Sequence, residues 1–179
     1  KGQDDLLGLS DEDSTGTADT PLEELSDVER FKAIPLFSKL SPAFDPQTGQ
    51  AMTGPVVGFA EISDTSAVNK MLAESEVQEL LPRDLRLLWA SEPSARFNNL
   101  MRLYAIKVDT RDGKAPLDGS VIVDASQQYD LGGNVEVEMV MNSQGARTWK
   151  EMTAEAASQQ PKRSVAVVLD NYVFTAPVV

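Results

Sequence analysis

Apolar and polar residues follow two different periods along the chain, and together they predict a mixed fold. Strict alternation over short segments is typical of half-buried strands, whereas apolar residues spaced three or four apart indicate amphipathic helices. Clusters of glycine, proline, asparagine and aspartate separate these segments and indicate turns. We expect strands over residues 56–62, 85–89, 101–108, 121–129, 135–141, 165–169 and 172–174. We expect helices over residues 21–40 and 63–75, a further helical turn ending at Pro82, and a helix that begins after Ser143.

The segment from residue 135 to residue 156 predicts a strand with one solvated face, followed by a helix. The apolar face of the strand carries Val135, Val137, Met139 and Met141. Ser143 is expected to cap the helix. The inward stripe of the helix is predicted to be Ala146, Trp149, Thr153 and Ala156. The spacing favours a core seam between strand and helix over an adaptable, methionine-lined peptide groove formed by Met139, Met141, Met152 and Trp149.

The last two predicted strands form a hairpin with Asp170 and Asn171 at its tip. Asparagine and aspartate tolerate the left-handed conformation that a two-residue hairpin turn requires. The predicted fold is therefore α+β, a mostly antiparallel sheet of five to seven strands with helices packed on one side.

Composition divides the chain into two parts. Residues 1–29 contain ten acidic residues and one basic residue, Lys1, and such a segment buries too little apolar surface to offset its ordering entropy. We expect an acidic, mobile arm over residues 1–29 and a globular domain over residues 30–179. No run of about 20 apolar residues is present to span a bilayer.

Charge and residue usage exclude several function classes. The net charge of −12, with only 16 scattered lysines and arginines, argues against binding to nucleic acid or to an anionic lipid surface. The absence of histidine and cysteine excludes imidazole acid–base chemistry, thiolate nucleophiles and almost all zinc sites. We therefore predict no enzyme activity and no cofactor.

Acidic clusters offer only weak alternatives. Residues 11–19 imitate the first positions of a calcium loop, but Leu22 stands where a bidentate glutamate is required. A second cluster, Asp109, Asp112 and Asp118, is explained by turn chemistry. Paired carboxylates for hydrolysis would have to face each other across a cleft. The candidates for such a pair are Glu136, Glu138, Asp124, which could be buried, and Asp170, a turn residue.

Short motifs over residues 104–179 occur in an order that resembles the first extracytoplasmic domain of the SecD family. A Tyr-Ala-Ile-Lys strand begins at Tyr104, and a Pro-Leu-x-Gly turn with a following Asp-Ala comes next. A Gly-Ala pair then opens a helix with a later threonine, and a Val-Leu-Asp hairpin ends in Ala-Pro. The matching residues are Tyr104, Pro116, Leu117, Gly119, Asp124, Ala125, Gly145, Ala146, Thr153, Leu169, Asp170, Ala176 and Pro177.

The resemblance implies a role without catalysis. It implies that this domain contacts unfolded preprotein emerging from the Sec translocon channel, acts with a SecF-type partner through the parent protein, and aids export driven by the proton-motive force. It further implies a location on the periplasmic face of the bacterial inner membrane, a fused SecD–SecF parent, and a chain that stops before the rest of the domain's base. The motif residues are expected to be mainly structural, and Asn171 departs from the family's usual glycine.

Two other function classes remain open at this point. The first is an extracytoplasmic module that binds sugars or peptidoglycan fragments, which needs a deep pocket lined by Trp89 or Trp149 with polar anchors. The second is a hydrolase that relies on carboxylates alone. Contact with an unfolded chain instead requires an exposed strand edge or a shallow apolar groove, and the sequence does not show which strand forms an edge.

Overall fold

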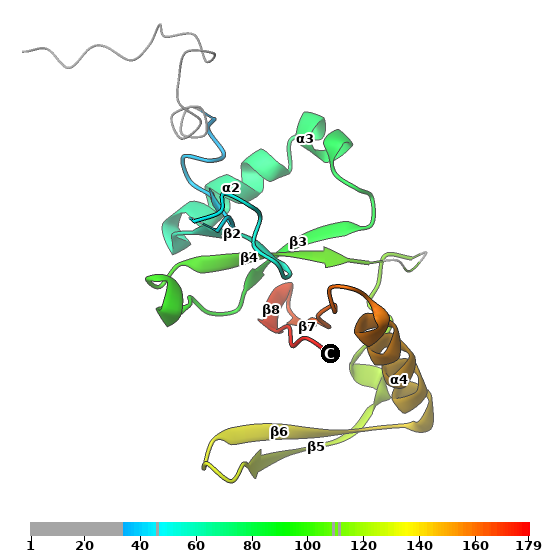
Figure 1. Ribbon diagram of the computed structural model, residues 1–179. Coiled ribbons are helices and arrows are strands. Elements are labelled where there is room, and N and C mark those ends of the chain that lie inside the picture. The colour runs from blue at the N-terminus through cyan, green and yellow to red at the C-terminus, as the bar shows by residue number, and fades with distance from the viewer. Residues whose placement is uncertain (1–33, 46, 109, 111) are drawn as a thin grey trace, which may run out of the picture. The chain divides into compact units, whose positions relative to one another are not determined.

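The computed structural model describes residues 34–179 except 46, 109 and 111 (Figure 1). The chain divides into two compact units, residues 1–38 and residues 39–179. In the first unit, the carbonyl of Ile34 accepts hydrogen bonds from the amides of Phe37 (2.9 Å) and Ser38 (3.2 Å). Residues 35–39 form turns, so the helix predicted to reach residue 40 is wrong over this stretch. Its remainder, the acidic arm and the calcium-like segment lie outside the described residues.

The second unit contains a six-stranded sheet in the order β1-β2-β4-β3-β8-β7. Its strands are β1 (Ser41–Pro42), β2 (Val56–Ala60), β3 (Leu85–Ala90), β4 (Met101–Lys107), β7 (Val167–Leu169) and β8 (Tyr172–Thr175). Every neighbouring pair is antiparallel except β3 and β8, which run parallel. A second sheet consists of β5 (Ile122–Tyr129) and β6 (Val135–Met141). The predicted α+β class with a mostly antiparallel sheet is confirmed.

The helices of the second unit lie where the sequence predicts them. They are α2 (Thr65–Leu72), α3 (Ser75–Leu80) and α4 (Ser143–Ser158), with short 3-10 turns η2 (Ile62–Asp64), η3 (Ala95–Phe97) and η4 (Gly119–Val121). No helix within the described ranges is both long and apolar enough to cross a membrane.

Apolar side chains cover both faces of the six-stranded sheet. On one face, α2 packs against β3, where the indole nitrogen of Trp89 donates to the Asn69 side chain of α2 at 2.8 Å. Val68 of α2 is fully buried, and Leu103, the β4 partner of Trp89, is 1% exposed. On the other face, Tyr104, Ala90 and Val173 form a buried cluster. Its rim contains Val56, Leu88, Ile106, Ala166 and Ala176.

Helix α4 begins one residue earlier than predicted. Asn142 is the cap, and its side-chain oxygen accepts from the Gly145 amide at 2.8 Å, so Ser143 is the first helical residue. The predicted inward stripe is correct at Thr153 and Ala156 but wrong at Ala146, which is exposed, and at Trp149, which is 37% exposed. The buried or half-buried positions of the helix are Gly145, Thr148, Met152, Thr153, Ala156 and Ala157. Gly145 explains the difference, because only a residue without Cβ lets α4 approach Val121 this closely.

Candidate functional site

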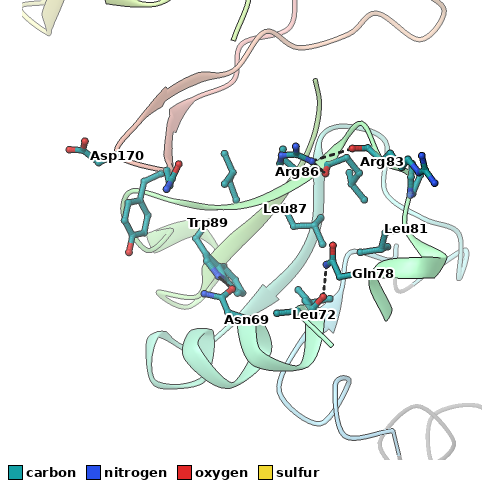
Figure 2. Close-up of a pocket in the computed structure, with 15 residues that line it drawn as sticks. Asn69, Leu72, Gln78, Leu81, Arg83, Arg86, Leu87, Trp89 and Asp170 are labelled. Atoms are coloured by element: carbon teal, nitrogen blue, oxygen red, sulfur yellow. Dashed lines mark hydrogen bonds between the residues drawn. The ribbon is translucent and has the colours of Figure 1, made fainter. Parts of the chain in front are cut away.

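A groove of about 850 Å³ runs along the part of β3 that β8 does not cover (Figure 2). One wall comes from α2, α3 and the segment after them, and the other from the turn between β7 and β8. Its lining is Asn69, Leu72, Ala73, Gln78, Leu81, Pro82, Arg83, Leu85, Arg86, Leu87, Leu88, Trp89, Asp170, Asn171 and Tyr172. The groove therefore combines leucine side chains with a strand edge at its floor.

Among the described residues, no strand pairs with one edge of β3 over most of its length. Strand β8 pairs only with the last two residues of β3, Trp89 and Ala90, whereas β4 pairs with β3 from Leu85 to Trp89. Backbone groups of alternate residues point to opposite sides of a strand. The Asp84 carbonyl accepts from Val108 on the β4 side, and the Ser91 amide donates to β8 at 2.9 Å. The peptide groups of Leu85 and Leu87 therefore point toward the open side.

The backbone N–H and C=O groups of Leu85 have hydrogen-bond partners, whereas those of Leu87 do not among the described residues. The Leu85 amide donates to the Pro82 carbonyl at 3.0 Å, and the Leu85 carbonyl accepts from the Arg86 guanidinium at 2.9 Å. No described residue forms a comparable hydrogen bond with the Leu87 amide or carbonyl. Its N–H and C=O form a donor–acceptor pair that a further strand can complete.

Charged and polar side chains lie at the two ends of the groove. Arg83 and Arg86 lie beyond Leu81 at one end, and Arg86 also donates to the Arg83 carbonyl at 3.2 Å (Figure 2). Gln78 donates to the Leu72 carbonyl at 2.6 Å, which ties α3 to the end of α2. Asp170 stands at the tip of the opposite wall.

The wall formed by the β7–β8 turn confirms the predicted two-residue hairpin. Asp170 and Asn171 have φ angles of 49° and 65°, the left-handed pair that this tight turn requires. Strands β7 and β8 pair on either side of it, from Leu169 opposite Tyr172 to Val167 opposite Thr175. The turn thus places Asp170 and Tyr172 at the groove.

The structure does not gather the motif residues into one site. Tyr104 is in the buried cluster and Ala176 packs at its rim, whereas the Pro177 carbonyl accepts from Val165 at 3.0 Å. Leu169, on edge strand β7, is 55% exposed. Of all the motif residues, only Asp170 lines the groove.

The remaining motif residues surround η4, β5 and α4. Pro116 is exposed, Leu117 is half-buried, and Gly119 opens η4; Asp124 and Ala125 lie exposed on β5. Gly145 and Ala146 are in the first turn of α4, and the half-buried Thr153 hydroxyl donates to the Trp149 carbonyl at 2.8 Å. That these residues serve mainly the fold stays a prediction.

The hairpin of β5 and β6 is exposed on both faces, which corrects the prediction of one buried face. Cross-strand pairs put Tyr129 opposite Val135, Gln127 opposite Val137 and Ala125 opposite Met139, all on one face. The other face carries Ser126, Gln128, Glu136 and Glu138. Tyr129, Val135 and Val137 are 62–66% exposed, and Met139 is 48% exposed, so Met139 is not a core residue. Trp149 is also exposed, whereas Met141 and Met152, which were predicted to share that seam, are half-buried.

Aspartates in this half of the chain shape loops. The Asp130 carboxylate accepts from the Gly132 and Asn134 amides, each at 2.8 Å, and from the Asn134 side chain. These bonds lower the pKa of Asp130, the Asn134 side chain contributing most. Hydrogen bonds from Ser120 similarly lower the pKa of Asp118.

Neither the predicted acidic cluster nor the carboxylate candidates converge on a site. Asp124 is exposed and bonded to its neighbour's amide at 3.0 Å, which corrects the suggestion that it could be buried. Within the described ranges, no three acidic side chains are grouped so that they could hold a metal ion. Asp109 lies outside those ranges.

A known protein family matches the second half of the chain. Residues 104–179 match the family model described as the SecDF P1 head subdomain. These residues belong to the SecDF P1 head family. Across 169 residues, covering 92% of this chain, the sequence is also 35% identical to the protein translocase subunit SecD of Rhodothermus marinus. The relationship to SecD predicted from the motifs is thus confirmed, and it extends upstream over β2, β3 and the groove.

The chain spans 25% of the length of this SecD relative. No solved structure matches the chain. The fusion of the parent to a SecF part stays a prediction.

The sequence predicts the strands of the groove but not the groove itself. The alternation of Leu85, Leu87 and Trp89 predicts a half-buried strand. The open edge depends on how far β8 extends beside β3, and these strands are separated by more than 80 residues. The signal available in the sequence is the pair of arginines, Arg83 just before β3 and Arg86 within an otherwise apolar strand.

Proposed function

We propose that the parent protein is an accessory subunit of the Sec translocase and that this domain contacts unfolded preprotein as it leaves the channel. The domain would lie on the periplasmic face of the inner membrane. Export would be aided by the proton-motive force through the parent's membrane part, together with the channel and a SecF-type partner. The observation that carries the proposal is the SecDF P1 head match over residues 104–179.

The groove gives this role a physical basis. An unfolded chain offers unpaired backbone groups and scattered apolar side chains, and proteins recognise such chains through strand edges and apolar grooves. Here the Leu87 peptide group and the surrounding leucines provide both in one place. A shallow contact of this kind suits a sequence that slides past, because backbone pairing does not depend on residue identity.

The alternative, a module that binds sugars or peptidoglycan fragments, has weaker support. It needs an enclosed pocket around Trp89 or Trp149. Trp89 is 6% exposed and its indole nitrogen is already bonded to Asn69, whereas Trp149 is not part of the groove lining. No facing pair of buried carboxylates supports a hydrolase among the described residues.

Photo-cross-linking in the full-length parent tests the proposal. Benzoylphenylalanine replaces one exposed aromatic residue at a time: Tyr172 in the groove, Tyr129 on the hairpin, or Phe174, which is on the same strand as Tyr172 but outside the groove. Their exposed fractions are 48%, 65% and 56%, so the three positions are matched in access. A preprotein stalled in the channel should form adducts at Tyr172 and not at Phe174. Absence of adducts at all three positions would refute preprotein contact.

A further inference from the structure

We propose that the groove binds an extended polypeptide segment as an added strand on the open edge of β3, and that it prefers segments in which apolar and acidic side chains alternate. This inference rests on the proposed function and specifies the chemistry of its substrate. It concerns the backbone register and side-chain pattern of the bound chain.

The open edge sets the length and anchor of the bound segment. Leu85–Leu88 spans about 13 Å at the usual rise of a strand, which accommodates four to five residues of a partner. Because the Leu85 groups are already bonded, Leu87 is the anchor: its amide and carbonyl can each form one hydrogen bond with the added strand. The turn at Asp170 and Asn171 limits the segment at the other end.

The two faces of β3 give the added strand two different environments. Leu87 and Trp89 point to the face covered by α2, where Leu72 and Leu81 also line the groove. Side chains directed to this face therefore meet an apolar surface. On the opposite face, an added strand lies beside Arg86 and Leu88, so alternate residues meet a guanidinium group.

Charge complementarity determines which polar residues suit that second face. The groove lining contains Arg83 and Arg86 against a single carboxylate, Asp170, a formal surplus of one positive charge in a chain of net charge −12. Asp84 and Asp112 line a second hollow beside the same two arginines, but neither arginine forms an ion pair with any described residue. A segment with carboxylates at alternate positions supplies the missing partners.

The first test measures binding of a labelled peptide to the full 179-residue chain by fluorescence anisotropy at physiological salt. The probe is acetyl-Gly-Ser-Val-Glu-Val-Glu-Val-Ser-Gly-amide with a fluorescein tag. Two matched controls carry backbone N-methyl groups, either on the three valines or on the two glutamates. In an added strand only one of these sets of amides points toward β3. We expect one methylation pattern to weaken binding about tenfold or more, because it removes a backbone bond and adds a clash, and the other to leave affinity nearly unchanged.

The direction of the added strand follows from the same result. Loss on valine methylation indicates an antiparallel strand, whose residue opposite Leu87 shares its face; loss on glutamate methylation indicates a parallel one. Equal effects of the two patterns, or no detectable binding at millimolar peptide, would overturn the inference.

The charge preference has its own variants. Replacing both glutamates of the peptide by lysine should weaken binding about fivefold at physiological salt. The change Arg83→Gln should reduce the difference between the two peptides, whereas Arg147→Gln, an equal change of charge on α4 outside the groove, should leave it intact. An unchanged difference in Arg83→Gln, or preference for the lysine peptide, would contradict the assigned pattern.

Amide exchange locates the contact. Bound peptide should slow hydrogen exchange of the Leu87 amide while leaving the amides of the β5–β6 hairpin unaffected. Protection of the hairpin without protection of Leu87 would refute strand addition at β3. If the hairpin alone is protected and preprotein also cross-links at Tyr129, strand addition at β3 is refuted but the proposed function stands. If no cross-link forms at Tyr172, Tyr129 or Phe174, the proposed function itself is refuted.

Discussion

Replacing Gly145 by alanine tests the close contact between α4 and Val121 in the second unit. A Cβ atom at this position would lie 2.7 Å from Val121 Cβ, 2.9 Å from Val121 Cγ2 and 3.3 Å from Met141 Cβ. Alanine gains up to about 1 kcal/mol in helix propensity, although less in the first turn. Overpacking typically costs about 1–3 kcal/mol, and the stiff Val121 cannot move aside by rotating a flexible end. We therefore expect Gly145→Ala to lower the free energy of unfolding by about 1–2 kcal/mol.

Urea denaturation of the full chain, followed by circular dichroism, measures this change. The matched control is Gly119→Ala, because a Cβ at Gly119 meets no atom within 4 Å and this glycine does not have a positive φ. The control should change stability by no more than about 0.5 kcal/mol. A Gly145→Ala variant as stable as the parent chain would show that α4 does not approach Val121 as described. The folding role predicted for the Gly-Ala motif would then be wrong.

Three further predictions concern single interactions. Asn171→Gly should raise the unfolding free energy by up to about 1 kcal/mol, because φ at this position is positive and glycine carries no Cβ penalty; a clear loss of stability in thermal denaturation would contradict the turn geometry. Trp89→Phe should lower stability by about 1 kcal/mol through loss of the 2.8 Å bond to Asn69, and chemical denaturation that detects no loss would argue against this bond. The Asp130 carboxyl should titrate below the ordinary aspartate value in an NMR titration, so its stabilising effect is present above that value and is lost as the pH falls through the lowered pKa; Asn134→Ala should move the midpoint upward, and an unmoved midpoint would contradict the assigned cause.

Local patterns predicted most of the elements because each pattern reports on nearby residues. The alternation of Leu85, Leu87 and Trp89 identified β3, and turn chemistry identified the tip at Asp170 and Asn171. The helix cap was misplaced by one residue because asparagine and serine both cap well, and the structure uses Asn142. Element boundaries depend on such close competitions.

Burial and edges could not be predicted in the same way, because they depend on contacts between distant segments. Val135, Val137 and Met139 alternate as a half-buried strand does, yet the described residues leave their face exposed. The parallel pairing of β8 with only the end of β3 likewise has no local signal. The motif residues identify the family correctly but not the groove, because all of them except Asp170 lie outside its lining, which depends on a strand edge.

The central claim is that the groove holds an extended chain. Cysteine scanning of a bound peptide tests this claim most directly. The chain contains no cysteine, so Ala73→Cys introduces a single thiol into the groove lining. A set of peptides with one cysteine at each successive position is then allowed to form disulfides with it under mild oxidation. The account predicts a yield that alternates with a period of two, because side chains of an added strand point alternately toward and away from α2. A uniform yield, or a period near 3.6, would contradict it.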